Sequence, residues 1–267
     1  MVAEPVTTRT TSVGLTRDES HIYSWSDGRT VAGPFPGVTS IIGVLDKSGP
    51  LMGWARRITA EAAVRHAAEL PKWAADFGTD AAVSLLTKAA TNETAKAADV
   101  GTRIHALAES VSLGREVLLT DEERPFLAAY QQWLADFAPT FLATEEMVIS
   151  LRHRYGGTFD AAVQIAGDVW LIDYKTSKGT YPETSLQLAA YANADFIGRP
   201  NDPVRYAVPA ATQFGVLHLR PEGYELIPYH VDADTFAAFV HARHLYEWRE
   251  TQARTVMGQA LGRHIVK

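Results

Sequence analysis

The feature that most constrains the fold is a change of composition next to Pro139. Residues 79–113 and 120–137 are rich in Ala and other helix-forming residues, and Pro139 follows the second segment. Three segments rich in Val, Ile, Phe, Trp and Thr come next, which favours strands: 141–150, 157–165 and 169–174. Gly167-Asp168 predicts a tight turn between the last two. Such a chain is expected to form an α/β fold.

The N-terminal part of the chain is expected to form an arm, a hairpin and helices. Residues 1–20 are polar and rich in Thr, which predicts a flexible arm. Apolar and polar residues alternate over 21–31 around Asp27-Gly28, which is typical of a β-hairpin. A loop at 33–37 and a short helix capped by Thr39 or Ser40 are predicted next. Two longer helices follow. The first covers 51–70 and ends at Pro71, and the second covers 79–113 with a break near 99–101.

The C-terminal part of the chain is predicted to mix helices with one further hairpin. The expected elements are a helix over 183–196, a hairpin formed by 213–219 and 224–229, and a helix that is capped by Asp232 or Asp234 and reaches about residue 256. No internal repeat or low-complexity linker divides the chain. We therefore expect one continuous domain, with a mainly helical N-terminal subregion over 21–140 and a core sheet with flanking helices over 141–267.

Composition excludes several classes of protein. The chain has 267 residues, a formal net charge of −6 and no cysteine. Disulfides, thiolate zinc sites, iron–sulfur clusters and cysteine nucleophiles are therefore excluded. The negative charge argues against bulk attraction to nucleic acid but is compatible with a local basic groove. The candidates for such a groove are Arg56, Arg57, Arg103, Arg152 and Arg154.

Sequence features bearing on location favour the cytoplasm. No apolar run approaches the ~18–20 residues of a membrane helix. The N-terminus lacks a basic segment followed by an apolar one, so no secretory signal is expected. We expect a cytoplasmic protein with no membrane segment.

Acidic and basic residues gather on two neighbouring predicted strands. Asp160 ends the Gly-Thr-Phe-Asp run inside the first strand, and Asp173 ends the next strand, with Lys175 two residues further on. Residues i and i+2 of a strand point to the same face, so Asp173 and Lys175 should project together. The turn at Gly167-Asp168 makes the strands antiparallel neighbours, which can bring Asp160 close to Asp173.

Two converging carboxylates favour a bound cation. Like charges repel and burial raises their pKa, and a hard divalent cation such as Mg²⁺ or Mn²⁺ relieves both effects. A metal, two carboxylates and the Lys175 ammonium together are suited to hydrolysis of a phosphodiester. The alternative is a solvated Asp-x-Lys ion pair, which is the commoner occurrence when that motif stands alone.

Several motifs together resemble a known family. Residues 157–160 (Gly-Thr-Phe-Asp) precede an apolar strand into 173–176 (Asp-Tyr-Lys-Thr), and a helix with Gln187 and Tyr191 follows. This order resembles the RecB-type branch of the PD-(D/E)XK nucleases, and more narrowly the CRISPR-associated RecB-like exonucleases and their bacteriophage relatives. Residues 101–105 (Gly-Thr-Arg-Ile-His) match the upstream Gly-Thr-x-x-His helix of that branch. Similarity to phage and mitochondrial members extends to segments 36–42, 46–47 and 53–55.

The resemblance implies a fold and a set of residue roles. The fold is a PD-(D/E)XK restriction-endonuclease-like core, in which helices flank a mixed central sheet. Lys175 would serve catalysis, while Gln187 and Tyr191 would support the site or contact DNA, although Tyr191 suits the core equally well. The implied metal ligands are His105, Asp160, Asp173 and the main-chain carbonyl of Tyr174. Without that resemblance, a lone His on an apolar helix face is more often a packed or surface residue.

Further candidates surround this set. Members of the family often carry another carboxylate one strand before the first metal Asp, where Glu145 and Glu146 both stand; strand alternation directs one of the two toward the site. Glu109 lies one turn after His105 and either orients the imidazole or is solvated. Lys178 either contacts a phosphate or is solvated, and Arg103 is a candidate for the basic groove or has a scattered surface role.

These observations lead to a functional expectation with two alternatives. We expect a Mg²⁺- or Mn²⁺-dependent deoxyribonuclease, an exonuclease rather than an endonuclease, in phage or bacterial DNA recombination, repair or processing. The host cytoplasm would then be its location. The alternatives are a nuclease-fold DNA-binding or assembly subunit without turnover, and a hydrolase of a small phosphate ester. The expected partners are DNA and either a second copy of the chain or a phage recombination protein. The iron–sulfur cluster of many CRISPR-associated relatives is excluded because there is no cysteine.

Overall fold

The fold is built on a large mixed sheet. The computed structural model describes residues 13–46 and 48–261. The main sheet has seven strands in the order β10-β9-β6-β5-β4-β7-β8. Every neighbouring pair is antiparallel except β6 and β9, which run parallel. The strands are β4 (Thr140–Ser150), β5 (Tyr155–Ile165), β6 (Asp168–Lys175), β7 (Phe196–Arg199), β8 (Asp202–Tyr206), β9 (Gln213–Arg220) and β10 (Gly223–Pro228).

A small antiparallel sheet lies against the edge of the main one. It consists of β1 (Gly14–Arg17), β2 (Ile22–Ser26) and β3 (Val31–Pro36) in that order. Single bridges join Gly14 to Pro200 and Gly37 to Gly156, and thereby connect the two sheets. The contact is apolar and is formed by Leu15, Tyr23, Trp25 and Phe35 with Ile149 and Phe196.

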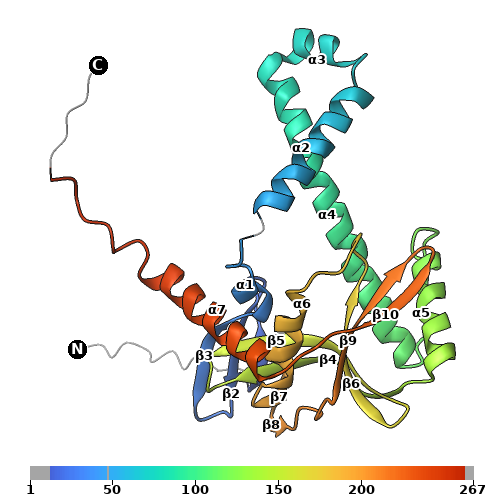
Figure 1. The fold of residues 1–267 in the computed structure, drawn as a ribbon, viewed down its shortest axis with the longest axis vertical. Helices are drawn as coiled ribbons and strands as arrows, with labels where there is room; N and C mark the ends of the chain where they lie inside the picture. The colour runs from blue at the N-terminus through green and yellow to red at the C-terminus, as the bar shows by residue number, and fades with distance from the viewer. Residues whose placement is uncertain (1–12, 47, 262–267) are drawn as a thin grey trace, which may run out of the picture.

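Helices cover both faces of the main sheet (Figure 1). One core cluster joins β4, β5 and β6 to α1 (Val38–Ile42), α6 (Thr184–Ala192) and α7 (Ala233–Thr251). A second cluster joins β5, β6 and β9 to α5 (Arg124–Phe137) and the C-terminal part of α4 (Thr79–Ser112). The structure is therefore α/β, with a large mixed sheet between helices.

Strand β6 shows how alternation divides side chains between these faces. Leu171 packs with the α6 cluster, whereas Ile172 and Tyr174 pack with the α4 and α5 cluster. Because side chains alternate along a strand, Asp173 and Lys175 are directed to the α6 face. The main chain at Tyr174 lies between the two faces, within reach of α4.

A helical arm projects from the sheet (Figure 1). It consists of α2 (Ser48–Arg65), α3 (Leu70–Phe77) and the N-terminal half of α4, which pack on one another. Helix α4 has 34 residues, and at a rise of about 1.5 Å per residue it spans roughly 50 Å. One helix therefore connects the arm to the second core cluster. Among the described residues, no helix combines the length and apolarity needed to cross a bilayer.

The strand predictions for the core are largely confirmed. Strands β4, β5 and β6 and the β9–β10 hairpin form where expected, and the β2–β3 hairpin turns at Asp27-Gly28. Asp232 caps α7 by accepting from the Thr235 N–H, while Asp232 N–H donates to the Thr235 hydroxyl. These elements have strong local signals, namely alternation, turn residues and a capping residue.

Several N-terminal predictions are wrong. Residues 14–17 form β1 instead of belonging to a flexible arm, because they pair with β2; residues 1–12 lie outside the described residues. The predicted loop at 33–37 supplies the end of β3, since Phe35 and Pro36 pair with β2. The cap of α1 is Gly37 rather than Thr39 or Ser40. The subregion over 21–140 thus begins with strands β2 and β3, where the hairpin was predicted, and helices α1 to α5 follow.

Helix boundaries account for the other errors. The expected break near 99–101 does not occur, because α4 is continuous. Pro71 does not end a helix but lies in the first turn of α3, where its missing N–H costs nothing. Helix α5 begins at Arg124 instead of 120, and α6 and α7 end before the expected limits of 196 and 256. The short strands β7 and β8 were not predicted, since they contain Gly198 and Pro203.

Candidate active site

Helix α4 brings His105 to the end of β6. A Cβ added to Gly101 would lie 3.2 Å from the Thr176 hydroxyl oxygen, so a glycine permits the close approach of helix and strand. One turn later, the His105 Nε2–H donates to the main-chain carbonyl of Tyr174 at 3.0 Å. In the Gly-Thr-x-x-His motif, the glycine therefore allows α4 to pack closely on the end of β6, and the histidine places a polar ring there.

Asp160 on β5 faces the other ring nitrogen of His105. Its Oδ1 lies 3.4 Å from His105 Nδ1, and its Oδ2 accepts from the Tyr174 N–H at 2.5 Å. Since the carbonyl of Tyr174 can only accept, Nε2 carries a proton and Nδ1 is directed at a carboxylate. A proton or a cation between Nδ1 and Asp160 makes this arrangement favourable.

The structure distinguishes the two neighbouring glutamates of β4. Pairs Thr144–Ala161 and Glu146–Phe159 flank Glu145, which places it opposite Asp160, and Glu145 Oε1 lies 3.9 Å from His105 Nδ1. Glu146 is directed away and pairs with Arg199 at 2.5 Å. Glu145 also has a positive φ of 49°. Such backbone is uncommon for a residue other than Gly and tends to occur at functional sites.

Asp173 and Lys175 project together from β6, as their spacing predicts. Lys175 Nζ lies 2.5 Å from Asp173 Oδ2, and the Asp173 side chain is buried. That oxygen has the ion pair but no hydrogen bond of acceptable geometry. Burial raises the pKa of Asp173 to about 6, although the charge of Lys175 opposes the rise. Burial would lower the pKa of Lys175, but the charges of Asp173 and Asp160 together prevail and raise the pKa.

The other groups of the site also depart from their ordinary behaviour. Burial alone would lower the pKa of His105, but the charges of Asp160, Asp173 and Glu145 and the hydrogen bond to Asp160 together outweigh it and raise the pKa to about 9. Burial raises the pKa of Glu145 to about 7, and the charge of Asp160 adds to this rise. Burial raises the pKa of Asp160 too, but the charges of His105 and Lys175 and the hydrogen bonds from His105 and the Tyr174 N–H together lower it, and the net direction is downward. Crowded, shifted carboxylates of this kind are typical of functional sites.

The donor set fits a hard cation. His105, Glu145 and Asp160 each offer one ligand atom, and these atoms all lie within 4.8 Å of one another. Glu145 Oε1 is buried without a hydrogen-bond partner. A divalent cation would satisfy such an oxygen and relieve the repulsion among the carboxylates. Metal-bound histidines commonly donate their second N–H to a main-chain carbonyl, as His105 does to Tyr174.

Two of the four expected ligands lie outside this cluster. Asp173 is paired with Lys175 and is not among the three grouped side chains. The carbonyl of Tyr174 accepts from the ring nitrogen of His105 that faces away from Asp160. The roles of Asp173 and of the Tyr174 carbonyl as metal ligands stay predictions. Glu145 is grouped with His105 and Asp160 as a candidate ligand.

Gln187 and Tyr191 are brought together on α6 next to β6. Gln187 Nε2 donates to the Tyr191 hydroxyl at 3.0 Å. Tyr191 is buried, and its ring lies where a side chain on Gly157 would have to be. Tyr191 therefore belongs to the core, whereas Gln187 reaches a cavity shared with Lys175.

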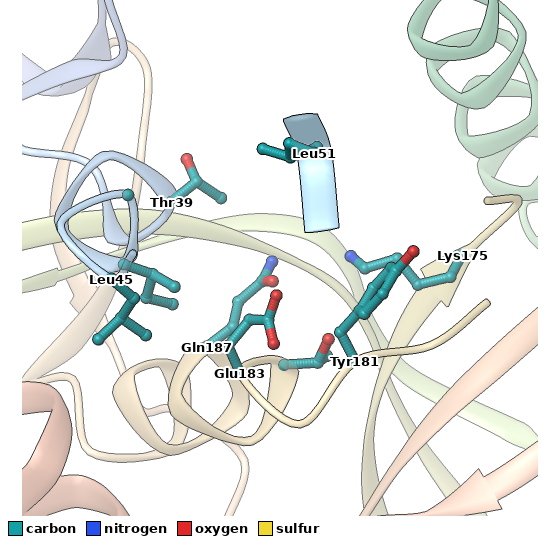
Figure 2. A pocket seen from close by; sticks show the side chains of 10 residues that line it. Thr39, Leu45, Leu51, Lys175, Tyr181, Glu183 and Gln187 are labelled. Atoms are coloured by element: carbon teal, nitrogen blue, oxygen red, sulfur yellow. The ribbon is translucent and has the colours of Figure 1, made fainter. Parts of the chain in front are cut away.

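That cavity opens on the α6 face beside Lys175 (Figure 2). The side chains of Lys175 and Gln187 approach it from opposite sides, and Leu51 of α2 lies across from them. Its volume is about 530 Å³, and it is lined by Thr39, Ile42, Gly43, Leu45, Leu51, Lys175, Tyr181, Glu183, Thr184 and Gln187. No sequence motif pointed to Tyr181 or Leu51, because their proximity to Lys175 arises only in the folded chain.

The remaining candidates have other contacts. The Arg103 guanidinium is paired with Glu123 at 2.6 Å, and its place in a basic groove stays a prediction. The two ring nitrogens of His105 face Tyr174 and Asp160, so Glu109 does not orient the imidazole. Burial is the main cause of the raised pKa of Glu145, and the charge of Glu109 adds to that rise. Lys178 is exposed, and its main-chain carbonyl accepts from Arg220. Its contact with a phosphate stays a prediction.

Comparisons with known proteins add little to this geometry. No protein-family model and no curated protein match the chain. A solved structure of the protein SSO0001 is similar, with a TM-score of 0.31 and 15% sequence identity. The match covers 48% of this chain and 58% of that chain, so this chain matches little more than half the length of that structure.

Proposed function

We propose that this chain is a Mg²⁺- or Mn²⁺-dependent deoxyribonuclease with a PD-(D/E)XK core, and that it acts as an exonuclease. The observation that carries the proposal is the meeting of side chains from four elements. His105 comes from α4, Glu145 from β4 and Asp160 from β5, next to the Asp173–Lys175 pair of β6. Oxygen and imidazole ligands beside a lysine are suited to phosphodiester hydrolysis.

The order of these residues supports the proposed core. Asp160 and the Asp-x-Lys pair lie on the neighbouring antiparallel strands β5 and β6 of a mixed sheet, and Gln187 follows on the next helix. This is the arrangement that the resemblance to RecB-type nucleases implies. The preference for an exonuclease, and for DNA recombination, repair or processing in a phage or bacterium, rests on that resemblance.

Each side chain has a defined task in this proposal. A bound Mg²⁺ or Mn²⁺ would offset negative charge on the phosphate and make a water more acidic. His105, Glu145 and Asp160 would hold the ion, and the Tyr174 carbonyl would fix the imidazole orientation. Lys175 would orient the attacking water or stabilise charge on a phosphate oxygen, while Asp173 holds its ammonium in place.

Degradation of linear DNA in the presence of Mg²⁺ tests the proposal. We expect the wild type to degrade linear DNA and to leave closed circular DNA intact, as an exonuclease requires free ends. Asp173→Ala and Lys175→Ala should reduce the rate by about 100-fold or more, because they remove preorganised charge. Equal rates in all three proteins would contradict the assignment.

One observation favours a second candidate function. A cavity of about 530 Å³ beside Lys175 has the size of a small-molecule site, so hydrolysis of a small phosphate ester is the alternative. The rates with p-nitrophenyl phosphate and with linear DNA distinguish the two functions. A protein that hydrolyses the ester and leaves DNA intact would have the alternative function.

A further inference from the structure

The cavity beside Lys175 has two kinds of wall. Leu45, Leu51 and Tyr181 present apolar surface, and each is more than a third exposed to solvent. Lys175 and Gln187 supply the polar part, with the Lys175 ammonium at one side (Figure 2). A ligand that suits both walls has a flat apolar body with polar edges and is attached to a negative group.

We infer that this cavity binds one unpaired nucleobase next to the scissile phosphate, an assignment that rests on the proposed nuclease function and specifies its substrate. A nucleobase has two apolar faces and a polar edge, and its phosphate would lie at the Lys175 side. A volume of about 530 Å³ is within the range of sites for molecules of this size.

Tyr181 is placed to stack on that base. Its side chain is 56% exposed, while its main-chain carbonyl accepts from the Tyr229 hydroxyl at 3.2 Å. The ring is therefore accessible although the main chain beneath it is held. Stacking of a base on an aromatic side chain contributes ~1–3 kcal/mol and accepts any of the bases.

The charges of the cavity argue that the base occupies it and the phosphate does not. Among the described residues that line the cavity, Lys175 is the cation, and it is paired with Asp173 of the proposed site. The phosphate is therefore drawn toward the metal ligands, which leaves the remainder of the cavity to the base.

A paired base cannot enter such a cavity, since its faces are stacked on its neighbours. Entry requires a single strand or a frayed end, for which the unstacking cost is least. The substrate is therefore a single-stranded DNA or the frayed end of a duplex.

Fluorescence of a 2-aminopurine base at the end of a single-stranded oligothymidylate tests this inference. Binding is measured in EDTA, so that no cleavage occurs and the result does not depend on catalysis. Wild type should quench the 2-aminopurine through stacking. Tyr181→Ala should abolish the quenching and weaken binding by about 5- to 100-fold, whereas Tyr181→Phe should keep both.

Two leucines provide a matched pair of variants. Leu51 of α2 lines the cavity, and Leu85 of α4 is a similarly exposed helical residue outside the lining, at 57% and 54% exposure. Leu51→Ala should weaken binding by about 3- to 10-fold through lost apolar contact. Leu85→Ala should leave binding unchanged. Both side chains are exposed, so both variants should fold.

The outcomes separate this inference from the proposed function. Absence of quenching in wild type, or equal quenching in Tyr181→Ala and wild type, overturns the base site even if the protein degrades DNA. The expected quenching pattern without Mg²⁺-dependent cleavage overturns the nuclease assignment and retains a site for an unpaired base. Equal affinity for an oligonucleotide that is abasic at the terminal position also overturns the base site.

Discussion

The Nδ1 atom of His105 lies 3.4 Å from Oδ1 of Asp160, while the opposite ring nitrogen donates to the Tyr174 carbonyl. The second contact fixes which nitrogen carries a proton. The first therefore joins a nitrogen lone pair to a carboxylate unless a proton or a cation lies between them. This relationship makes the imidazole a sensitive probe of metal binding.

His105→Ala should impair binding of Mn²⁺. Loss of a ligand beside the remaining Glu145 and Asp160 should weaken the affinity by about 10-fold or more, as even supporting groups of metal sites have effects of that size. Isothermal titration calorimetry measures the change. The control is His66→Ala, since His66 lies in the helical arm, directly after α2. Unchanged Mn²⁺ affinity in His105→Ala would rule out the imidazole as a ligand.

Glu145→Gln and Glu146→Gln should differ although the residues are neighbours. Glu145 belongs to the cluster around His105, whereas Glu146 pairs with Arg199 on the other side of the strand. We expect Glu145→Gln to lower Mn²⁺ affinity and DNA cleavage by about 10- to 100-fold. Glu146→Gln should leave both within about 2-fold, because exposed ion pairs contribute little. The reverse order of effects would mean that β4 presents the other glutamate.

Glu123→Gln should reduce stability above pH 5 but not at low pH. Hydrogen bonds from the main chain and hydroxyl of Thr120, and then from Arg103, lower the pKa of Glu123 from 4.5 to about 2. A lowered pKa in the folded state gives stability that is complete above the unfolded pKa and is lost as the pH falls through the folded one. Urea unfolding of both proteins from pH 7 to pH 2 measures the difference. A difference that is constant over this range would contradict the prediction.

Gly157→Ala should destabilise the protein. A Cβ at this position would overlap the Tyr191 ring, and both groups are buried, so neither can move freely. Overpacking of this kind costs ~1–3 kcal/mol, which urea unfolding detects. Gly179→Ala is the matched control, because no atom lies within 4 Å of its added Cβ. Equal stabilities of the two variants would mean that the ring of Tyr191 gives way.

The part of the site that is local in sequence could be predicted from the sequence. Asp160, Asp173 and Lys175 lie on two strands joined by the turn at Ala166-Gly167, so period-two alternation and one turn suffice to bring them together. His105 could be included only through a family motif, because periodicity does not state which helix face meets which strand.

What the sequence did not reveal depends on tertiary packing. Alternation alone left Glu145 and Glu146 equivalent, and the choice follows from the pairing of β4 with β5 on one side and the Arg199 contact on the other. Arg103 is a candidate for a basic groove, and a carboxylate distant in sequence pairs with it. Tyr181 and Leu51 meet at a cavity whose walls come from segments far apart along the chain.

The continuity of α4 has a mechanical consequence. Its N-terminal half packs on α2 and α3, and its C-terminal part carries His105 against Tyr174. Sharp bends in helices have local causes such as Pro or a π-bulge, and α4 is one continuous helix without proline. We therefore expect a displacement of α3 to be transmitted along α4 and to change the alignment of the His105 ring with Asp160.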